Sequence, residues 1–220
     1  MTEQQLLLHP PATEQRLNMS YESFLQWSDD THAEWVNGEV IVFMPPLDRH
    51  QLLAGFLHAL ILQYAQLFHL GTIRIAPFEM RHLPGYASRE PDLLFIAQAN
   101  LHRLTSERVD GPADLVIEIV SPTSVKRDYA TKFGEYQQAG IREYWIVDPR
   151  DEAQQTTFYQ LDEQQTYQEI PLDNQGCYHS LVLPGFWLRP TWLMQTNLPA
   201  VSDVMLMVCG DAYIAHLQKR

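Results

Sequence analysis

The sequence predicts a mixed α/β fold (α+β mixed) in which helices flank a central mixed β-sheet and the C-terminal part is rich in β-structure. Three observations support this prediction: one long helical pattern, a strand–helix–strand unit near the middle, and several short strand patterns near the end. A strand, a helix and a second strand close in sequence typically form a parallel crossover. The chain has 220 residues, 45% of them hydrophobic, which is enough for one core.

The N-terminal region is predicted to contain an arm, a short helix and a hairpin. Residues 1–19 are expected to be a flexible arm, because the segment is polar and contains two consecutive prolines. Ser20 suits an N-cap, so a short helix is expected over "YESFLQW". The two strand-like runs of "AEWVNGEVIVF" are joined by Asn37-Gly38, which is a strong hairpin signal.

The middle of the chain alternates between helical and strand patterns. Apolar residues recur at helical spacing over residues 48–70, which predicts one core-facing helix with Gly71 at its C′ position. "TIRIAPFEMRHL" alternates like a single strand, "PDLLFIA" is a further strand candidate, and "DLVIEIV" is the predicted central strand. A helix from Thr123 or Ser124 to Gly140 then leads to the strand "REYWIVDP", which completes the parallel crossover.

The last part of the chain predicts short strands followed by a helix. The segments "TTFYQL", "YQEIPL" and "YHSLVLPGFWL" form the expected β-rich part, and "SDVMLMVCGDAYIAHLQ" is expected to be helical. We therefore expect one domain over residues 20–198, followed by a C-terminal helical extension over residues 199–220.

Charge and composition limit the functional classes. A formal net charge of −12 argues against a non-specific nucleic-acid coat, but a nuclease remains compatible because a metal site built from carboxylates is itself acidic. Two cysteines are too few for a disulfide framework, so free thiols in the cytoplasm are expected. No signal-peptide pattern is present, and glycine, histidine and glutamine interrupt the longest apolar stretch, so no membrane span is expected.

Four charged residues stand where apolar or turn residues are the rule. Glu118 interrupts a buried strand pattern, Asp92 follows Pro91 at the head of another, and Glu34 lies among the apolar residues of the hairpin. Lys132 lies on the predicted helix after Glu118. An isolated buried carboxylate is costly, so Glu118 should be neutralised, paired or bound to a cation.

The spacing of the helix after Glu118 suggests a partner for it. Asp128, Lys132 and Tyr136 follow each other at four-residue steps and share one helix face. A helix packed back onto the sheet could point Lys132 at the strand of Glu118. Two carboxylates on neighbouring strands would suit Mg²⁺, and a lysine beside them could orient or deprotonate the attacking water or stabilise charge on a phosphate.

These residues belong to a longer pattern that resembles a known family. The pattern comprises "EWVNGEVIVFMPPLDRHQLLAGFLHALI", "EPDLLFI", "GPADLVIEIVSPTS" and "RDYATKFGEYQQAGIREYWIVDP". It covers about residues 21–188 and resembles the Uma-two family of proposed restriction endonucleases, within the PD-(D/E)xK nuclease superfamily. The resemblance implies a restriction endonuclease-like core, Mg²⁺ or Mn²⁺ as cofactor, DNA as substrate and partner, and, by analogy, a homodimer.

The resemblance also implies a set of catalytic residues: Glu34, Asp92, Glu118 and Lys132. Asp92 matches the motif aspartate and Glu118 the second acid, and Glu34 matches an N-terminal glutamate expected near the metal, so all three are expected metal ligands. The usual lysine position, two residues after the second acid, is occupied by Val120. Lys132 on the following helix is expected to replace it.

Taken one at a time, these residues also have simpler explanations. Glu118 fits a buried ion pair equally well, Asp92 a strand-end turn, and Lys132 an exposed helix position. His50 at the start of the long helix is expected to be a polar first-turn residue, with a site residue as the alternative. Two functions follow: a metal-dependent endonuclease that hydrolyses phosphodiester bonds of DNA, or a catalytically inactive nuclease-fold binding or scaffold protein. The side of the helix on which the Lys132 amine lies discriminates between them.

Overall fold

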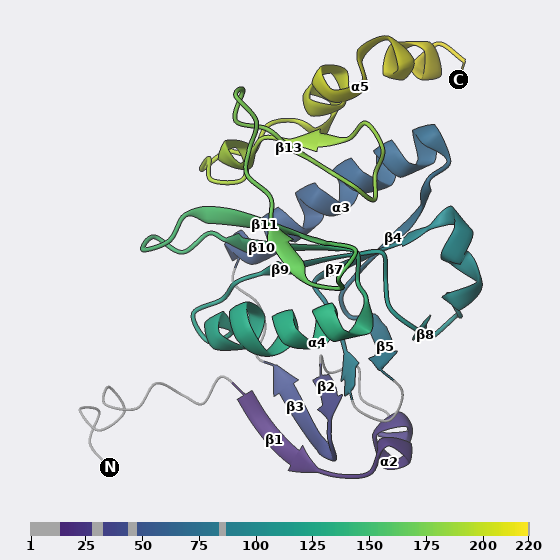
Figure 1. Cartoon of the computed structure of the whole chain (residues 1–220), viewed down its shortest axis with the longest axis vertical. Coiled ribbons are helices and arrows are strands. Elements are labelled where there is room, and N and C mark those ends of the chain that lie inside the picture. Colours follow the sequence, from purple (N-terminus) through teal and green to yellow (C-terminus); the bar gives the residue numbers. More distant parts are fainter. Residues whose placement is uncertain (1–13, 28–32, 44–47, 84–86, 220) are drawn as a thin grey trace.

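The computed structural model describes residues 14–27, 33–43, 48–83 and 87–219, which form two six-stranded β-sheets, a two-stranded sheet and several helices (Figure 1). The central sheet consists, in spatial order, of β12 (Tyr167–Glu169), β11 (Gln155–Leu161), β10 (Glu143–Asp148), β9 (Leu115–Ile119), β7 (Leu93–Ala97) and β4 (Gly71–Ile75).

The pairing of the central sheet matches the predicted mixed topology. β9 and β10 are parallel, while β10 and β11, β9 and β7, and β7 and β4 pair in antiparallel fashion. Every residue of β9 and β10 is buried, which explains why both segments are nearly continuous apolar runs in the sequence. The predicted α/β fold with a central mixed sheet is confirmed.

The crossover between β9 and β10 is a helix whose first part is π-helical and whose second part is α-helical. The helical segment covers residues 125–139 and comprises a π-helical part, η2 (Arg127–Lys132), followed by α4 (Phe133–Ala139). It begins slightly later than predicted and ends at Gly140 as expected. The Tyr144 hydroxyl of β10 donates a hydrogen bond to the Asp128 carbonyl at 3.0 Å, within the π-helical part. Short π-helical segments interrupt α-helices mainly at functional sites.

A second sheet lies on the other side of this helix (Figure 1). Its strands are, in spatial order, β1 (Glu14–Asn18), β3 (Glu39–Phe43), β2 (Ala33–Val36), β6 (Ala87–Arg89), β5 (Glu79–Leu83) and β8 (Arg108–Asp110). β2 and β3 form the predicted hairpin, with positive φ at both turn residues, 51° at Asn37 and 90° at Gly38. That pair of angles is typical of a type I′ turn. The predicted helix after Ser20 is α2 (Tyr21–Gln26), with the Ser20 side chain as N-cap.

Two predictions about strands differ from the structure. Residues Glu14–Asn18 pair with β3 and are therefore not a loose arm; residues 1–13 of that arm lie outside the described residues. "TIRIAPFEMRHL" is two strands rather than one, because β4 joins the central sheet and β5 joins the second sheet. Pro77 lies between them and has no N–H group for a strand ladder, so the chain changes sheets there.

The long predicted helix is α3 (Asp48–Phe68), and its buried face packs into the core on the central sheet. Gly71 does not cap it: His69, directly after the helix, has the left-handed φ of 55°, and Gly71, with a φ of 144°, is the first residue of β4. Among the described residues, α3 is the one helix long and apolar enough to cross a membrane, which corrects the expectation that no segment approaches a span. A buried core helix meets the same criterion.

The C-terminal part is attached to the central sheet through a buried glutamate. It contains β13 (Tyr178–His179), β14 (Trp187–Leu188) and the 3₁₀ turn η3 (Pro190–Trp192). Outside this part, a further 3₁₀ helix, η1 (Gln98–Arg103), follows β7 of the central sheet. Glu143 of β10 accepts hydrogen bonds from the Tyr178 hydroxyl at 2.7 Å, and from the backbone N–H groups of residues 181 and 182 at 2.9 Å. The predicted last helix is α5 (Val201–Leu217), which packs on α3 and has non-helical angles at Gly210.

Candidate functional site

Two of the predicted carboxylates lie side by side on neighbouring strands. The antiparallel register pairs Leu93 of β7 with Ile117 of β9, so the next position along places Asp92 beside Glu118. The Asp92 Oδ2 atom accepts a hydrogen bond from the backbone N–H of Ile119 at 2.7 Å, which fixes this carboxylate against β9. Glu118 is only 3% exposed. The predicted adjacency of these two carboxylates is therefore present in the structure.

Lys132 points from the π-helical part toward these carboxylates. Its Nζ atom donates a hydrogen bond to Glu118 Oε1 at 2.8 Å and forms longer ion pairs with Glu34 Oε1 at 3.4 Å and Asp128 Oδ1 at 3.9 Å. The Tyr136 hydroxyl also donates to Glu118 Oε1, at 2.8 Å. Asp128, Lys132 and Tyr136 thus share the helix face that their spacing predicts, and the amine lies on the near side of the helix.

Glu34 reaches the same region from the second sheet. Its Oε2 atom accepts a hydrogen bond from Arg89 Nη1 at 2.8 Å, and its Oε1 atom accepts one from the backbone N–H of Glu90 at 3.1 Å. Arg89 in turn donates to both carboxylate oxygens of Glu135, each at 2.8 Å. Glu34 is therefore held between two cations, Arg89 and Lys132, where the two sheets approach each other.

His50 lies in the first turn of α3, as expected, and its side chain contacts a predicted site residue. Its Nε2 atom lies 3.1 Å from Asp92 Oδ2, so α3 contributes a contact to the carboxylate. Burial would lower the pKa of His50, but the hydrogen bond and the charge of Asp92 raise it instead. Asp92 is thus held on one oxygen by two donors from different elements, His50 and the backbone of Ile119.

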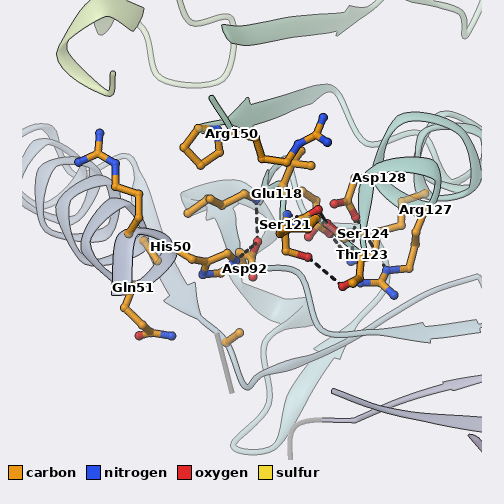
Figure 2. A pocket seen from close by; sticks show the side chains of 18 of the residues that line it. His50, Gln51, Asp92, Glu118, Ser121, Thr123, Ser124, Arg127, Asp128 and Arg150 are labelled. Atoms are coloured by element: carbon orange, nitrogen blue, oxygen red, sulfur yellow. Dashed lines mark hydrogen bonds and ion pairs between the residues drawn. The ribbon is translucent and has the colours of Figure 1, made fainter. Parts of the chain in front are cut away.

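All four predicted residues line one cavity of about 800 Å³, together with His50 and Asp128. Figure 2 shows His50 and Asp92 on one side of this cavity, Glu118 in the centre, and Asp128 and Arg127 on the other. Arg49 and Arg150 also line it, whereas Lys126, six residues before Lys132, does not. The size is typical of sites that bind small ligands or a segment of a larger one.

The carboxylates in this cavity differ in how well positive charge compensates them. Burial raises the pKa of Glu118 to about 8, because the attraction of Lys132 does not offset burial and the neighbouring carboxylates. Burial also raises the pKa of Asp128 to about 6, and its Oδ1 atom has no hydrogen-bond partner among the described residues. Lys132 therefore does not fully compensate the negative charge of Glu118 and Asp128.

Two other groups show the opposite balance. Burial would raise the pKa of Glu34, but Lys132 and Arg89 outweigh it and lower the pKa to about 2. The pKa of Lys132 is raised: burial acts to lower it, but Glu118 and Glu34 favour the charged ammonium more strongly. Lys132 is therefore protonated at neutral pH.

The side chains at the cavity can be compared with what the predicted Mg²⁺ or Mn²⁺ requires. Among the residues that the structure describes, no group of three or more His, Cys, Asp or Glu side chains is arranged to hold a metal ion. Magnesium usually takes only one or two protein carboxylates, with waters and substrate oxygens completing its octahedron. Asp92 and Glu118 are adjacent at a cavity, and Lys132 does not offset the burial of Glu118, so the two carboxylates fit that requirement.

Comparisons with known proteins place this chain in a family and a fold. The family model Uma2, described as "Putative restriction endonuclease", matches residues 21–191. The chain belongs to the Uma2 family. A crystal structure from Anabaena variabilis, of a protein described as "a putative nuclease belonging to DUF820", matches with a TM-score of 0.62 at 17% identity, covering 79% of this chain and 96% of that one. No curated protein matches the chain.

Family membership and the structural match together establish the restriction endonuclease-like fold and a place among nuclease-like proteins. At 17% identity the crystal structure shows the shared fold alone. Neither comparison assigns a role to an individual residue, so the roles of the site residues in this Uma2-family chain stay predictions.

Three residues around the site were not singled out from the sequence as site residues. His50, Arg89 and Glu135 all contact one of the predicted carboxylates or its partner. Arg89 lies in "SREPD", three residues before Asp92, and an arginine beside a buried strand is the signal that could have indicated it. Nothing local marks Glu135, whose role depends on the position of Arg89 in another sheet.

Proposed function

We propose that this Uma2-family protein is a metal-dependent endonuclease that hydrolyses phosphodiester bonds of DNA. The observation that carries the proposal is the meeting of Asp92, Glu118 and Lys132 at one cavity, with the ammonium 2.8 Å from Glu118. The side of the helix on which the amine lies therefore favours the enzyme over the inactive binding protein.

Asp92 and Glu118 would hold the Mg²⁺ or Mn²⁺ ion in this proposal. The bound ion would supply Lewis-acid stabilisation of the negative charge that develops on the phosphate group. His50 and the Ile119 backbone hold Asp92 Oδ2, which keeps the carboxylate in one orientation beside Glu118. Tyr136 and Lys132 hold Glu118 Oε1 in the same way.

The reaction is hydrolysis by a water molecule. The water oxygen forms a bond to phosphorus, one phosphorus–oxygen ester bond breaks, and the products are a phosphate monoester and a hydroxyl group. Lys132 stabilises the phosphate oxygens as a cation, because the neighbouring carboxylates Glu118 and Glu34 favour its charged form and raise its pKa. Asp128 accepts that proton: its Oδ1 atom lacks a hydrogen-bond partner in the described structure, and its pKa of about 6 suits a base near neutral pH. The leaving oxygen takes a proton from solvent.

DNA as the substrate must be reconciled with the net charge of −12. Three arginines line the same cavity, from α3, from η2 and from the turn after β10: Arg49, Arg127 and Arg150. Such a local group of guanidinium groups offers contacts to phosphates that the overall charge does not reveal. A cytoplasmic location and a homodimer complete the proposal.

The proposed metal site is tested by calorimetry with Mn²⁺ on the wild-type protein and on Asp92→Ala. Asp92→Ala should weaken Mn²⁺ binding by more than about tenfold. Removing a residue that only supports a metal ligand costs roughly tenfold in metal affinity, and removing a ligand itself should cost more. Cleavage of plasmid DNA in Mg²⁺ should disappear in the same variant. Asp211→Ala, on the exposed surface of α5, is the matched control and should retain both properties.

Two results would count against the proposal. Equal Mn²⁺ affinity or equal cleavage by wild type and Asp92→Ala would remove Asp92 from the site. A wild-type protein that binds Mn²⁺ but cleaves neither DNA nor RNA would favour the binding or scaffold function instead.

A further inference from the structure

We propose that Glu34 positions Lys132 and is not a metal ligand, and that Arg89 holds Glu34 in that role. The proposal deepens the proposed nuclease function and rests on it. It also replaces, for Glu34, the ligand role implied by the family resemblance. Glu34 thereby becomes a positioning residue, and the metal ion is left to the carboxylates of the central sheet.

The first reason is that the oxygens of Glu34 already have cationic or N–H partners. Oε2 accepts from Arg89 Nη1 at 2.8 Å, while Oε1 lies 3.4 Å from Lys132 Nζ and accepts the backbone N–H of Glu90 at 3.1 Å. The residue is 1% exposed, so no water competes with these partners. A divalent ion on Glu34 would lie beside both an ammonium and a guanidinium group, whereas an ion on Glu118 would have only the ammonium as an ion-paired cation among the described residues. Like charges repel strongly at a buried site, so Glu34 is the less favourable ligand.

The second reason is the distribution of charge across the cavity. Glu34 pairs with two cations, Arg89 and Lys132, whereas Glu118 and Asp128 on the other side share the ammonium group of Lys132. A divalent cation is therefore attracted to the side of the central sheet and not to Glu34.

The third reason is that the ion pairs form a closed chain through one helix. Lys132 contacts Glu34, Glu34 contacts Arg89, and Arg89 forms a two-bond contact with Glu135. Glu135 and Lys132 lie three residues apart on the same helical segment. The position of the ammonium group is thus fixed relative to β2 and β6 of the second sheet. A reacting group that shifts by about 1 Å can lose roughly 100-fold in rate, so such a support matters for catalysis.

The chain offers a direct assay of this support because it contains only three lysines: Lys126, Lys132 and Lys219. Acylation of lysine amines, followed by peptide mass spectrometry on the metal-free protein, compares Lys132 with the two others in the same molecule. The test variant is Glu34→Gln, which removes the charge and preserves the shape. The matched control is Glu39→Gln, on the same hairpin, whose carboxylate pairs with Arg16 at the surface.

We expect Glu34→Gln to raise acylation of Lys132 about tenfold relative to the other lysines, because Lys132 loses a buried anionic partner. Mn²⁺ affinity should stay within about threefold of wild type, and DNA cleavage should lose about 10- to 100-fold in kcat with little change in KM. Glu39→Gln should behave like wild type in all three assays. Arg89→Lys, which retains the charge but not the planar fork, should change Lys132 acylation and kcat in the same direction as Glu34→Gln.

The outcomes separate this proposal from the nuclease function. A loss of Mn²⁺ affinity in Glu34→Gln as large as in Asp92→Ala would make Glu34 a ligand and overturn the proposal. An unchanged Lys132 acylation ratio in both Glu34→Gln and Arg89→Lys would also overturn it. If Glu34→Gln labels all three lysines equally fast, because it does not fold, Arg89→Lys decides. If the wild-type protein neither binds Mn²⁺ nor cleaves DNA, the nuclease function fails, while the acylation ratio still reports whether Glu34 holds Lys132.

Discussion

At the scale of single residues, Glu118 has the most unusual environment in the cavity. It is a carboxylate inside a fully buried strand, and its one positive partner, Lys132, is shared with Glu34 and Asp128. Burial and the neighbouring carboxylates raise its pKa from 4.5 to about 8. In the metal-free folded protein Glu118 therefore holds a proton that the unfolded chain has already released between these pH values.

This raised pKa predicts how stability depends on pH. Because the folded state binds more protons, the contribution of Glu118 to the free energy of unfolding falls as pH rises from about 4.5 to about 8, by up to about 1.4 kcal/mol per pH unit. Glu118→Gln cannot ionise and should remove this part of the slope. Urea unfolding of wild type and variant across this pH range measures it.

The exposed Glu107→Gln is the control and should follow the wild-type curve. Added Mg²⁺ should flatten the wild-type slope, because a bound cation favours the ionised carboxylate. Parallel curves for wild type and Glu118→Gln would show that Glu118 ionises normally in the folded protein.

At the scale of elements, the position of Asp92 depends on how β4, which follows α3 in the chain, pairs at the edge of the central sheet. β4 is the edge partner of β7, the strand that Asp92 precedes. Gly71 begins β4 with a φ of 144°, and a Cβ atom there would lie 2.0 Å from the carbonyl oxygen of Ile96. Only glycine fits this approach, since both the backbone angle and the space exclude a side chain.

Gly71→Ala should therefore lower the free energy of unfolding by at least about 2 kcal/mol, through the strained backbone and the clash with β7. Gly134→Ala is the matched control: it lies in α4, with open space where the added methyl group would point and no positive φ. That variant should gain about 0.5–1 kcal/mol, because alanine favours the helix. Urea denaturation of both variants decides the point, and equal effects at the two glycines would contradict it.

At the scale of the whole molecule, charge governs assembly and partner binding. The chain carries a net charge of −12, so two copies repel each other unless salt screens them. The proposed homodimer should therefore be weaker at low ionic strength than at about 0.15 M salt.

Sedimentation velocity across salt concentrations tests this expectation. At about 0.15 M salt we expect a species of twice the 25.5 kDa chain mass, with a growing monomer fraction as salt is removed. A single species at the mass of one chain under all conditions would exclude the dimer.

Much of the fold and part of the site could be predicted because their signals are local. The Asn37-Gly38 turn, the apolar spacing of α3 and the crossover from β9 to β10 each lie within one continuous segment of the chain. Glu118 was recognisable because a carboxylate breaks an apolar run, and that contrast needs no knowledge of distant segments.

The sequence by itself thus determined the strands β7 and β9, the acids Asp92 and Glu118 that accompany them, and the helix face that carries Lys132. Only the tertiary structure decided that β4 and β5 enter different sheets, that His50 meets Asp92, and that Arg89 and Glu135 hold Glu34. These contacts join residues far apart in the chain. A long-range ion pair leaves no periodic trace in sequence, because its geometry depends on how whole elements pack and not on the preferences of neighbouring residues.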